Sequence, residues 1–353
     1  MSETSDNNNP PQHITDIQHN DFIWTWSSNK KSSRVSLWIP YLLEISKIPR
    51  SSLWRISYNG GVLEVDLKKV EFILFYGATG SLPLDFLDAL SINGIICILH
   101  RRNIERPYFF FTSNLNDQYD VLSKQICVRC NEIKSTYLSR ILIKERIQKM
   151  IDGYSIASTY IDDLNKARNV ASVRNVEAIA TRQYWKKWYE SMGLDSKRRE
   201  DSPINTALNA CSKFVYGVIL RWVLFHKLSP CHGFLHEPTN YPSLVYDLIE
   251  PYRYIIEIAT KEAYMQLFEM DEKKLISYSI ENVKALLEEV VYVPVTKQYV
   301  RRKNLLHGIV LALRAYLIGE SRHLIIPKEG ISKGGRPPNC GYRLPGEIYK
   351  RKK

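Results

Sequence analysis

The sequence predicts an α+β fold in which a β-rich N-terminal domain precedes an all-α C-terminal domain. Short apolar runs, several of them alternating with polar residues, occupy the first third of the chain. Apolar residues at three- and four-residue intervals occupy most of the remainder, as in amphipathic helices. With 353 residues, 44% of them hydrophobic, the chain is long enough to form two packed cores.

Changes in composition divide the chain into five stretches. The first is a polar lead that we expect to be disordered, and the third is a short polar linker. The last is basic, since the final 21 residues contain seven Lys or Arg and one acid. The predicted boundaries are a lead at 1–20, a β-rich domain at 21–112, a linker at 113–117, a helical domain at 118–326 and a basic tail at 327–353.

The elements of the β-rich domain follow from turn residues and periodicity. Two alternating runs flank Asn59 and Gly60, which predicts a hairpin. The apolar runs at residues 70–76 and 95–99 predict buried strands, and leucines at helical spacing predict a helix at 82–90. Residues 107–112, with one Tyr and three Phe, predict a further strand.

The helical domain shows long periodic segments at residues 119–151, 169–192 and 205–226. Cys127 and Cys130 form a C-x-x-C pair within the first of them. A zinc site needs further ligands, and the sequence offers no second pair at a suitable spacing. We therefore expect these two cysteines to be packed helix residues.

The charge of the chain favours polyanionic partners. Its formal net charge is +12 and its pI is about 9.2. Aromatic and basic residues alternate at 182–188, which suits either stacking on bases or a helix with an aromatic core face and a solvated basic face. We see no secretory signal and no apolar run of membrane-spanning length, so an intracellular protein with reduced thiols is expected.

The most informative segment is residues 229–253. Ser243 is a natural N-cap for a helix that would carry Asp247 and Glu250 on one face. Pro251 is expected to bend that helix beside the two carboxylates, and His236 lies in the preceding loop. One imidazole and two carboxylates can bind Mn²⁺, or Mg²⁺ together with waters. The alternative is a pair of solvated acids and a surface histidine.

Three ordered motifs resemble the CRISPR adaptation integrase family. The first matches a G-L-x-P-x-x-G-F-L-H pattern followed by S-L-x-x-D-L-x-E-P-x-R, with Lys227 in place of the initial Gly. The second is similar to G-x-E-x-x-x-A-x-x-Y-[FW], with Asn175 in place of the Gly. The third, at 201–209, is similar to D-P-I-N-x-x-L-N with one inserted residue. The residues that match the first two are Leu228, Pro230, Gly233, Phe234, Leu235, His236, Ser243, Leu244, Asp247, Leu248, Glu250, Pro251, Arg253, Glu177, Tyr184 and Trp185.

This resemblance implies a metal-dependent DNA strand transferase or endonuclease in which the helical domain is catalytic. Glu177, His236 and Glu250 would be ligands of Mg²⁺ or Mn²⁺. Asp247 would be a fourth catalytic residue, either a direct ligand or a group that orients one. A 3′-hydroxyl of a short DNA fragment would attack a phosphodiester of a CRISPR repeat, in antiviral defence.

The resemblance also implies contacts with DNA. Arg253, Arg301, Arg302 and Arg314 would bind its backbone, although Arg253 can equally pair with a neighbouring Glu. Tyr246 lies either beside the active site or in the core.

The expected partners are double-stranded DNA, a second copy of the chain joined through the β-rich domain, and a small second CRISPR adaptation protein that bridges two dimers. No membrane is expected, and the location would be the cytoplasm of a prokaryote. The rival hypotheses are a casposon-type transposon integrase and a non-catalytic basic DNA-binding protein.

Overall fold

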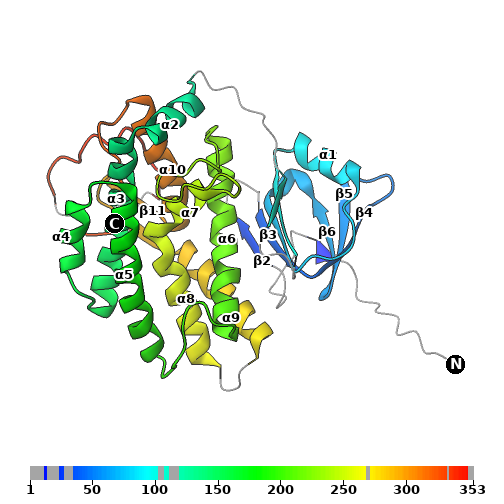
Figure 1. The fold of residues 1–353 in the computed structure, drawn as a ribbon. Helices are drawn as coiled ribbons and strands as arrows, with labels where there is room; N and C mark the ends of the chain where they lie inside the picture. The colour runs from blue at the N-terminus through cyan, green and yellow to red at the C-terminus, as the bar shows by residue number, and fades with distance from the viewer. Residues whose placement is uncertain are drawn as a thin grey trace, which may run out of the picture. The chain divides into compact units, whose positions relative to one another are not determined.

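A computed structural model describes most of the chain as two compact units, residues 1–114 and 115–353 (Figure 1). The predicted linker lies outside the described residues, as do most of the predicted lead and the last five residues. The described residues are 12–13, 24–27, 35–101, 107–110, 119–267, 271–331 and 334–348.

The first unit contains a four-stranded sheet in the order β1-β6-β5-β4. The predicted hairpin is confirmed, because β5 and β6 pair antiparallel with Tyr58 opposite Gly61. Gly61 has φ of +140°, a conformation that a residue with a side chain rarely adopts. The strands are β1 (Gln12–His13), β4 (Leu42–Lys47), β5 (Leu53–Tyr58) and β6 (Gly61–Asp66).

A five-stranded sheet in the order β2-β3-β7-β8-β9 completes the first unit. Its central strand β7 pairs parallel with both β3 and β8, which explains why residues 72–75 are all apolar and buried, without alternation. Helix α1 (Leu84–Ile92) buries Phe86 and Leu90 in the core. The predicted strands and helix of this region are thus confirmed. The strands are β2 (Trp24–Ser27), β3 (Val35–Pro40), β7 (Val70–Tyr76), β8 (Ile96–His100) and β9 (Tyr108–Phe110), and a 3₁₀ turn η1 (Leu67–Lys69) precedes β7.

The second unit is mainly helical, which confirms the α+β class with strands first and helices after them. The helix predicted at 119–151 is in fact two helices, because the side chain of Asn131 accepts a hydrogen bond from the backbone N–H of Lys134 and starts a new helix. The helices are α2 (Val121–Cys130), α3 (Glu132–Tyr154), α4 (Thr159–Lys166), α5 (Val170–Glu190), α6 (Pro203–Phe225), α7 (Ser243–Ile249), the 3₁₀ turn η2 (Glu250–Tyr252), α8 (Arg253–Gln266), α9 (Glu272–Glu288) and α10 (Lys303–Ile318).

Three expectations for this unit need correction. The second unit is not all-α, because β10 (Val290–Val293) and β11 (Gln298–Arg301) form an antiparallel hairpin before α10. Cys127 and Cys130 lie on α2 as expected, but both are exposed and neither is packed. The Gly and Pro content of the basic tail predicts no packed element, and the described residues after α10 form no helix or strand, yet they are packed rather than free: Gln298 bonds both backbone groups of Leu344, which is buried.

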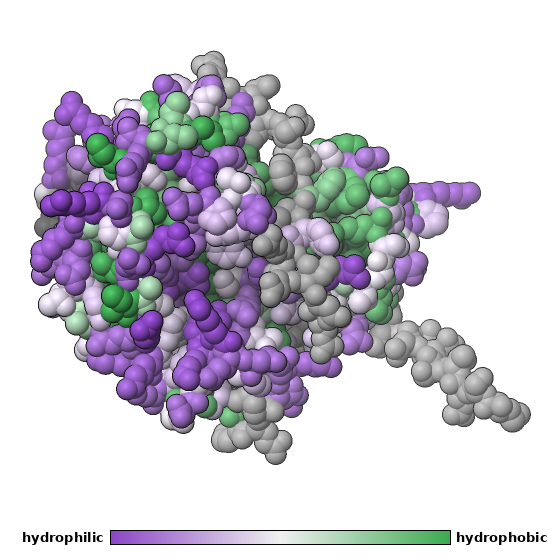
Figure 2. Space-filling view, viewed as in Figure 1, coloured by the Kyte–Doolittle hydropathy of each residue, from purple (hydrophilic) through white to green (hydrophobic). Residues whose placement is uncertain are grey.

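Helix α6 is the core helix of the second unit. It packs against α7, α8, α9 and α10. Among the described residues it is the one helix that is long and apolar enough to cross a membrane, but 61% of its apolar window is buried inside the unit. Its composition is therefore explained by the core. Figure 2 shows hydrophilic residues over most of the visible face of this unit.

Candidate active site

The loop before α7 is organised by one carboxylate. Asp247, on α7, has no exposed surface and accepts hydrogen bonds from three consecutive backbone N–H groups, those of Phe234, Leu235 and His236, at 2.5–3.0 Å. Its Oδ1 atom also lies 2.7 Å from Nδ1 of His236. Both oxygens of Asp247 thus accept hydrogen bonds from the protein, which favours the second of its two expected roles, orienting His236, over direct binding of a metal ion.

Gly233 allows this loop to come so close to α7. A Cβ atom at this position would lie 2.8 Å from Oδ2 of Asp247 and 2.9 Å from the carbonyl carbon of Ser243. The backbone N–H of Gly233 donates to Oγ of Ser243 at 3.0 Å. Ser243 holds the loop against α7, but it is the first residue of that helix and not the N-cap that the sequence predicted, because Pro242 occupies the N-cap position.

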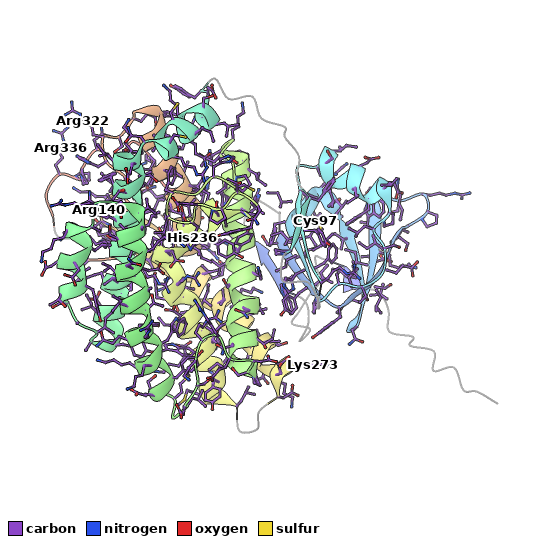
Figure 3. The ribbon with its side chains drawn as sticks, in the orientation of Figure 1. Cys97, Arg140, His236, Lys273, Arg322 and Arg336 are labelled. Atoms are coloured by element: carbon purple, nitrogen blue, oxygen red, sulfur yellow. The ribbon has the colours of Figure 1, made fainter. Side chains whose placement is uncertain are left out.

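Helix α2 holds the other side of the loop. The side chain of Gln125 bonds the backbone of Ser229 and His232, and Arg129 donates to the carbonyls of Gly233 and Glu237. The loop is thus clamped between α2 and α7. Figure 3 shows His236 in the middle of the helical unit.

The bend predicted at Pro251 takes the form of a change of helix type. Helix α7 ends at Ile249, the 3₁₀ turn η2 runs over Glu250–Tyr252, and α8 starts at Arg253. Pro251 lacks the backbone N–H that would donate to the carbonyl of Asp247 in an α-helix, so the series of helical hydrogen bonds is interrupted there. As a result Asp247 faces the loop, while Glu250, which is 1% exposed, faces α3.

Arg146 of α3 joins the two glutamates that the sequence places far apart. Its Nη1 atom donates to Oε1 of Glu177, on α5, at 2.8 Å, and also to Oε2 of Glu250. Arg253 adds a second cation, with Nε 2.8 Å from Oε1 of Glu250. Glu177 and Glu250 therefore converge on one nitrogen atom, from α5 and η2.

Charges and burial set the protonation behaviour of the cluster. Burial raises the pKa of Glu177, and the charge of Glu250 adds to this effect. Burial acts in the same direction on Glu250, but the charges of Arg146 and Arg253 outweigh it and hold its pKa below the usual range. Burial acts to lower the pKa of His236, but the hydrogen bond and charge of Asp247, with the charges of Glu250 and Glu177, raise it.

A fourth acid completes the cluster. Glu257, on α8, is 6% exposed and accepts a hydrogen bond from the hydroxyl of Tyr184 at 2.7 Å. Burial raises the pKa of Glu257, and the charge of Arg146 works against that shift. The Tyr184 that matched the motif is thus a buried anchor for this acid.

The donor set fits a divalent cation in its chemistry. Glu177 and Glu250 already bind one cation, the guanidinium of Arg146. Because Asp247 bonds Nδ1 of His236, the other ring nitrogen, Nε2, is left to bind a metal ion. Among the described residues, no three His, Cys, Asp or Glu side chains yet lie where they would hold one ion together. Arg146 takes the position between the two glutamates instead.

The expected DNA contacts divide into two groups. Arg301 pairs with Glu288, and Arg302 pairs with Glu289 and Glu329 at 2.8 and 3.0 Å, so both side chains stabilise the hairpin and the start of α10. These ion pairs do not test whether Arg301 and Arg302 also contact DNA, which stays a prediction.

The remaining expected contacts lie closer to the cluster or to α2. The guanidinium of Arg314 lies 5.4 Å from the ring centre of Tyr119. Arg253 pairs with Glu250, as its alternative interpretation held. Tyr246 is half-buried beside His236, with ring centres 6.3 Å apart, and its hydroxyl accepts from Lys213 at 3.1 Å.

Two residues of the cluster escaped the sequence analysis. Arg146 occupies a position on the buried stripe of α3, between Ile143 and Met150, where an apolar residue is the rule. A charged residue on the apolar stripe of a helix could have indicated a functional role for Arg146 from the sequence alone. Lys213 lies on the core helix α6 and reaches Tyr246, and no motif includes it.

Comparisons with known proteins find similar sequences and similar folds. The sequence profile of the family described as "CRISPR associated protein Cas1" matches residues 50–262. A CRISPR-associated endonuclease Cas1 from Pyrococcus horikoshii is 26% identical, over 42% of this chain and 52% of that protein. One from Methanocaldococcus jannaschii is 31% identical, over 28% and 33%. The chain thus spans about half the length, or less, of these curated relatives.

Solved structures share the fold. A Cas1 protein from Thermotoga maritima has a TM-score of 0.67 with 19% identity, covering 84% of this chain and all of that one. A casposase bound to its integration product has a TM-score of 0.65 with 15% identity, covering 81% and 91%. The Cas6-RT-Cas1–Cas2 complex has a TM-score of 0.69 with 12% identity, covering 87% and 37%.

Proposed function

Because this chain belongs to the Cas1 family of CRISPR-associated proteins, we propose that it is a metal-dependent DNA integrase that inserts short DNA fragments into a CRISPR repeat array. The observation that carries the proposal is the convergence of Glu177 and Glu250 beside a histidine whose tautomer is set by Asp247. A non-catalytic basic DNA-binding protein would have no use for carboxylates held together in a mostly buried place.

The proposed reaction is strand transfer. A 3′-hydroxyl at the end of a fragment attacks a phosphodiester at the repeat boundary, a new phosphodiester forms, and the 3′-oxygen of the repeat strand leaves. Bound Mg²⁺ or Mn²⁺ would polarise the phosphoryl oxygen and stabilise the leaving oxygen. Glu177, Glu250 and Nε2 of His236 would hold the ion, and Asp247 would keep the imidazole in the tautomer that presents Nε2.

The surroundings suit a reaction that depends on positioning. Asp247, Gln125 and Arg129 hold the loop of His236 from two helices, so the imidazole has little freedom. Tyr246 lies beside His236 and accepts a hydrogen bond from Lys213, and both side chains can contact the DNA strand near the reacting phosphate. Arg253, with 22% of its side chain exposed, can neutralise phosphate charge there.

A basic pocket between α3 and α4 offers a further contact for the DNA backbone. It has a volume of about 440 Å³ and is lined by Arg140, Lys166 and Arg168, with no acidic residue in its lining. Thr136 also lines it, and its buried hydroxyl has no hydrogen-bond partner among the described residues. Arg140 precedes Arg146 by six residues, about 9 Å along α3. In Figure 3 Arg140 lies on the α4 side of α3.

The proposed assembly follows the family. The β-rich unit would join two copies of the chain, and a small second adaptation protein would bridge two such dimers on double-stranded DNA. One support is the similarity to the Cas1 chain of a complex that also contains Cas2. The reaction would take place in the prokaryotic cytoplasm. A casposon-type integrase would share the fold, as the casposase structure illustrates. The curated relatives, all named as CRISPR-associated, favour the CRISPR substrate.

The test is a strand-transfer assay with Mn²⁺, a fragment with free 3′-hydroxyls and a labelled repeat duplex. We expect His236→Ala and Glu177→Ala each to lower strand transfer at least about 100-fold while DNA binding is retained. The matched controls are His323→Ala and Glu190→Ala. His323 is an exposed histidine, and Glu190 is an exposed glutamate on α5, the helix that also carries Glu177. Transfer at the wild-type rate in either active-site variant would reject the proposal.

A further inference from the structure

Arg146 is a fully charged side chain in a buried place. It is 6% exposed and lies on the inward stripe of α3, next to η2. Taking a guanidinium out of water costs several kcal/mol unless its charge is compensated by well-placed acceptors. Glu177 and Glu250 supply that compensation, both through the same Nη1 atom. The place between the two carboxylates is therefore already held by a cation of the protein itself.

Two buried polar atoms in this cluster remain without a hydrogen-bond partner among the described residues. One is Nε of Arg146 and the other is Oε1 of Glu257. They are a donor and an acceptor of opposite charge, and the charges of Arg146 and Glu257 act on each other. Unsatisfied groups of this kind are rare in protein interiors and call for an explanation. Here they identify Glu257 as a third carboxylate within the electrostatic reach of the guanidinium.

The carboxylate of Glu257 is held in place for a contact with Arg146. Tyr184 donates to Oε2 of Glu257 at 2.7 Å, which fixes the carboxylate and leaves Oε1 available. The aromatic ring of Tyr184 packs edge-on against Tyr154, which restrains the donor in turn. Arg146 thus has two sets of acceptors: the glutamates of the candidate metal site, with which it is paired, and Glu257 of α8, which is not yet used.

We infer that Arg146 is a positioning residue whose guanidinium has two alternative positions. It holds Glu177 and Glu250 together before a divalent cation binds, and it moves towards Glu257 when that cation takes its place. This inference rests on the proposed function, because it assumes that the two glutamates are metal ligands. The protein would thereby avoid the repulsion of two adjacent buried carboxylates without metal, and the repulsion of two adjacent cations with it.

The inference predicts opposite effects of two substitutions on metal affinity. Arg146→Met keeps the apolar stem but removes the competing charge, so Mn²⁺ affinity should rise on the order of tenfold. Glu257→Gln keeps an acceptor for Tyr184 but weakens the second position of Arg146, so Mn²⁺ affinity should fall several-fold. In the double variant the Glu257→Gln effect should disappear, because the residue that uses Glu257 is gone.

The measurement is titration of the full-length protein with Mn²⁺ by calorimetry, with thermal unfolding in chelator and in Mn²⁺ as a second readout. Arg146→Met should melt earlier than wild type in chelator and recover in Mn²⁺. Unchanged or lower Mn²⁺ affinity in Arg146→Met would overturn the inference, as would a Glu257→Gln effect that persists in the double variant. If Arg146→Met does not fold, Glu257→Gln alone tests the inference. Unchanged Mn²⁺ affinity in that variant would contradict the second position of Arg146, beside Glu257.

The outcomes also separate this inference from the proposed function. If wild type binds Mn²⁺, and His236→Ala weakens that binding, the metal site stands whatever Arg146 does. If wild type does not bind Mn²⁺, or if His236→Ala and Glu177→Ala leave Mn²⁺ binding unchanged, the metal site itself is rejected and the role of Arg146 with it. Lys328→Met is the matched control, because Lys328 forms an ion pair with Glu145 of the same α3 helix but is exposed.

Discussion

At the residue scale, Asp247 combines a structural and a chemical role. Its two oxygens accept from three backbone N–H groups and lie beside the imidazole of His236. The same carboxylate therefore shapes the loop and selects which ring nitrogen faces the site. Gly233 belongs to this unit, because any side chain there would collide with the carboxylate.

We expect Asp247→Asn to separate these roles. In the variant, the amide NH₂ group replaces one carboxylate oxygen and lies against two groups that now donate hydrogen bonds to that oxygen. Donor then meets donor, so the free energy of unfolding should fall by about 2–4 kcal/mol. Mn²⁺ affinity should fall about 10–100-fold because His236 is no longer oriented. Urea unfolding and Mn²⁺ titration measure both, and Asp152→Asn, on the exposed face of α3, is the control. Full Mn²⁺ affinity in Asp247→Asn would contradict this role.

The pH dependence of Mn²⁺ binding belongs to the same experiment. Asp247 raises the pKa of His236, so the wild-type imidazole takes up a proton, and Mn²⁺ binding weakens, as the pH falls through that raised pKa. In Asp247→Asn the pKa of His236 should be lower, and the pH at which Mn²⁺ binding weakens should shift to a lower value. A shift to higher pH would contradict the electrostatic account.

At the element scale, most helices and strands were predictable because local signals define them. Asn59 and Gly60 mark the hairpin, and the caps at Asn169 and Ser202 mark the starts of α5 and α6. The break at Asn131 was missed because an Asn inside a periodic run is a weaker signal than a Gly or Pro. Hairpin β10–β11 was missed because its strands have four residues each.

The catalytic candidates were predictable for a different reason. Glu177, His236, Asp247 and Glu250 fall within motif segments, and spacing along the chain reveals them. The contacts of Arg146 depend on how α3, α5 and η2 pack, which no local pattern encodes. The pairing of Arg301 and Arg302 with glutamates is equally non-local, and no local pattern in the sequence reveals it.

The proposed binding of the DNA backbone in the pocket between α3 and α4 can be tested by removing its positive charges. Replacing Arg140, Lys166 and Arg168 with Gln should reduce the slope of log K against log salt for DNA binding by about 2–3, if each cation neutralises one phosphate. Fluorescence anisotropy over a salt series measures this slope. A triple control at Lys186, Lys197 and Lys273 removes the same charge elsewhere on the surface. Equal slope changes in the two triple variants would reject the pocket as a specific contact.

At the scale of the whole molecule, each unit has a hydrophobic core of its own. The segment after α10 belongs to the second core despite its glycines and prolines. Tyr252 donates to the carbonyl of Pro327 at 2.6 Å, and Tyr342 donates to that of Ile325 at 2.6 Å. Removing the basic residues by truncation would therefore also remove packing, and only charge substitution isolates their effect on DNA binding.

Gln298 provides the sharpest test that this segment stabilises the second unit. It is 1% exposed; its Nε2 donates to the carbonyl of Leu344 at 3.0 Å, and its Oε1 accepts from the Leu344 N–H at 2.9 Å. Gln298→Ala leaves both backbone groups without these partners, so we expect the second unit to lose about 2–4 kcal/mol of unfolding free energy. Gln148→Ala, at an exposed position, should change it by less than about 0.5 kcal/mol.

Hydrogen exchange locates the effect of Gln298→Ala. Protection should fall in β11 and α10, which contact the segment, and stay constant in β5 and β7, because the first unit has a separate core. A uniform loss of protection in both units would mean that they unfold together as one cooperative body. Unchanged protection everywhere would mean that the segment after α10 contributes nothing to the stability of the core on which it packs.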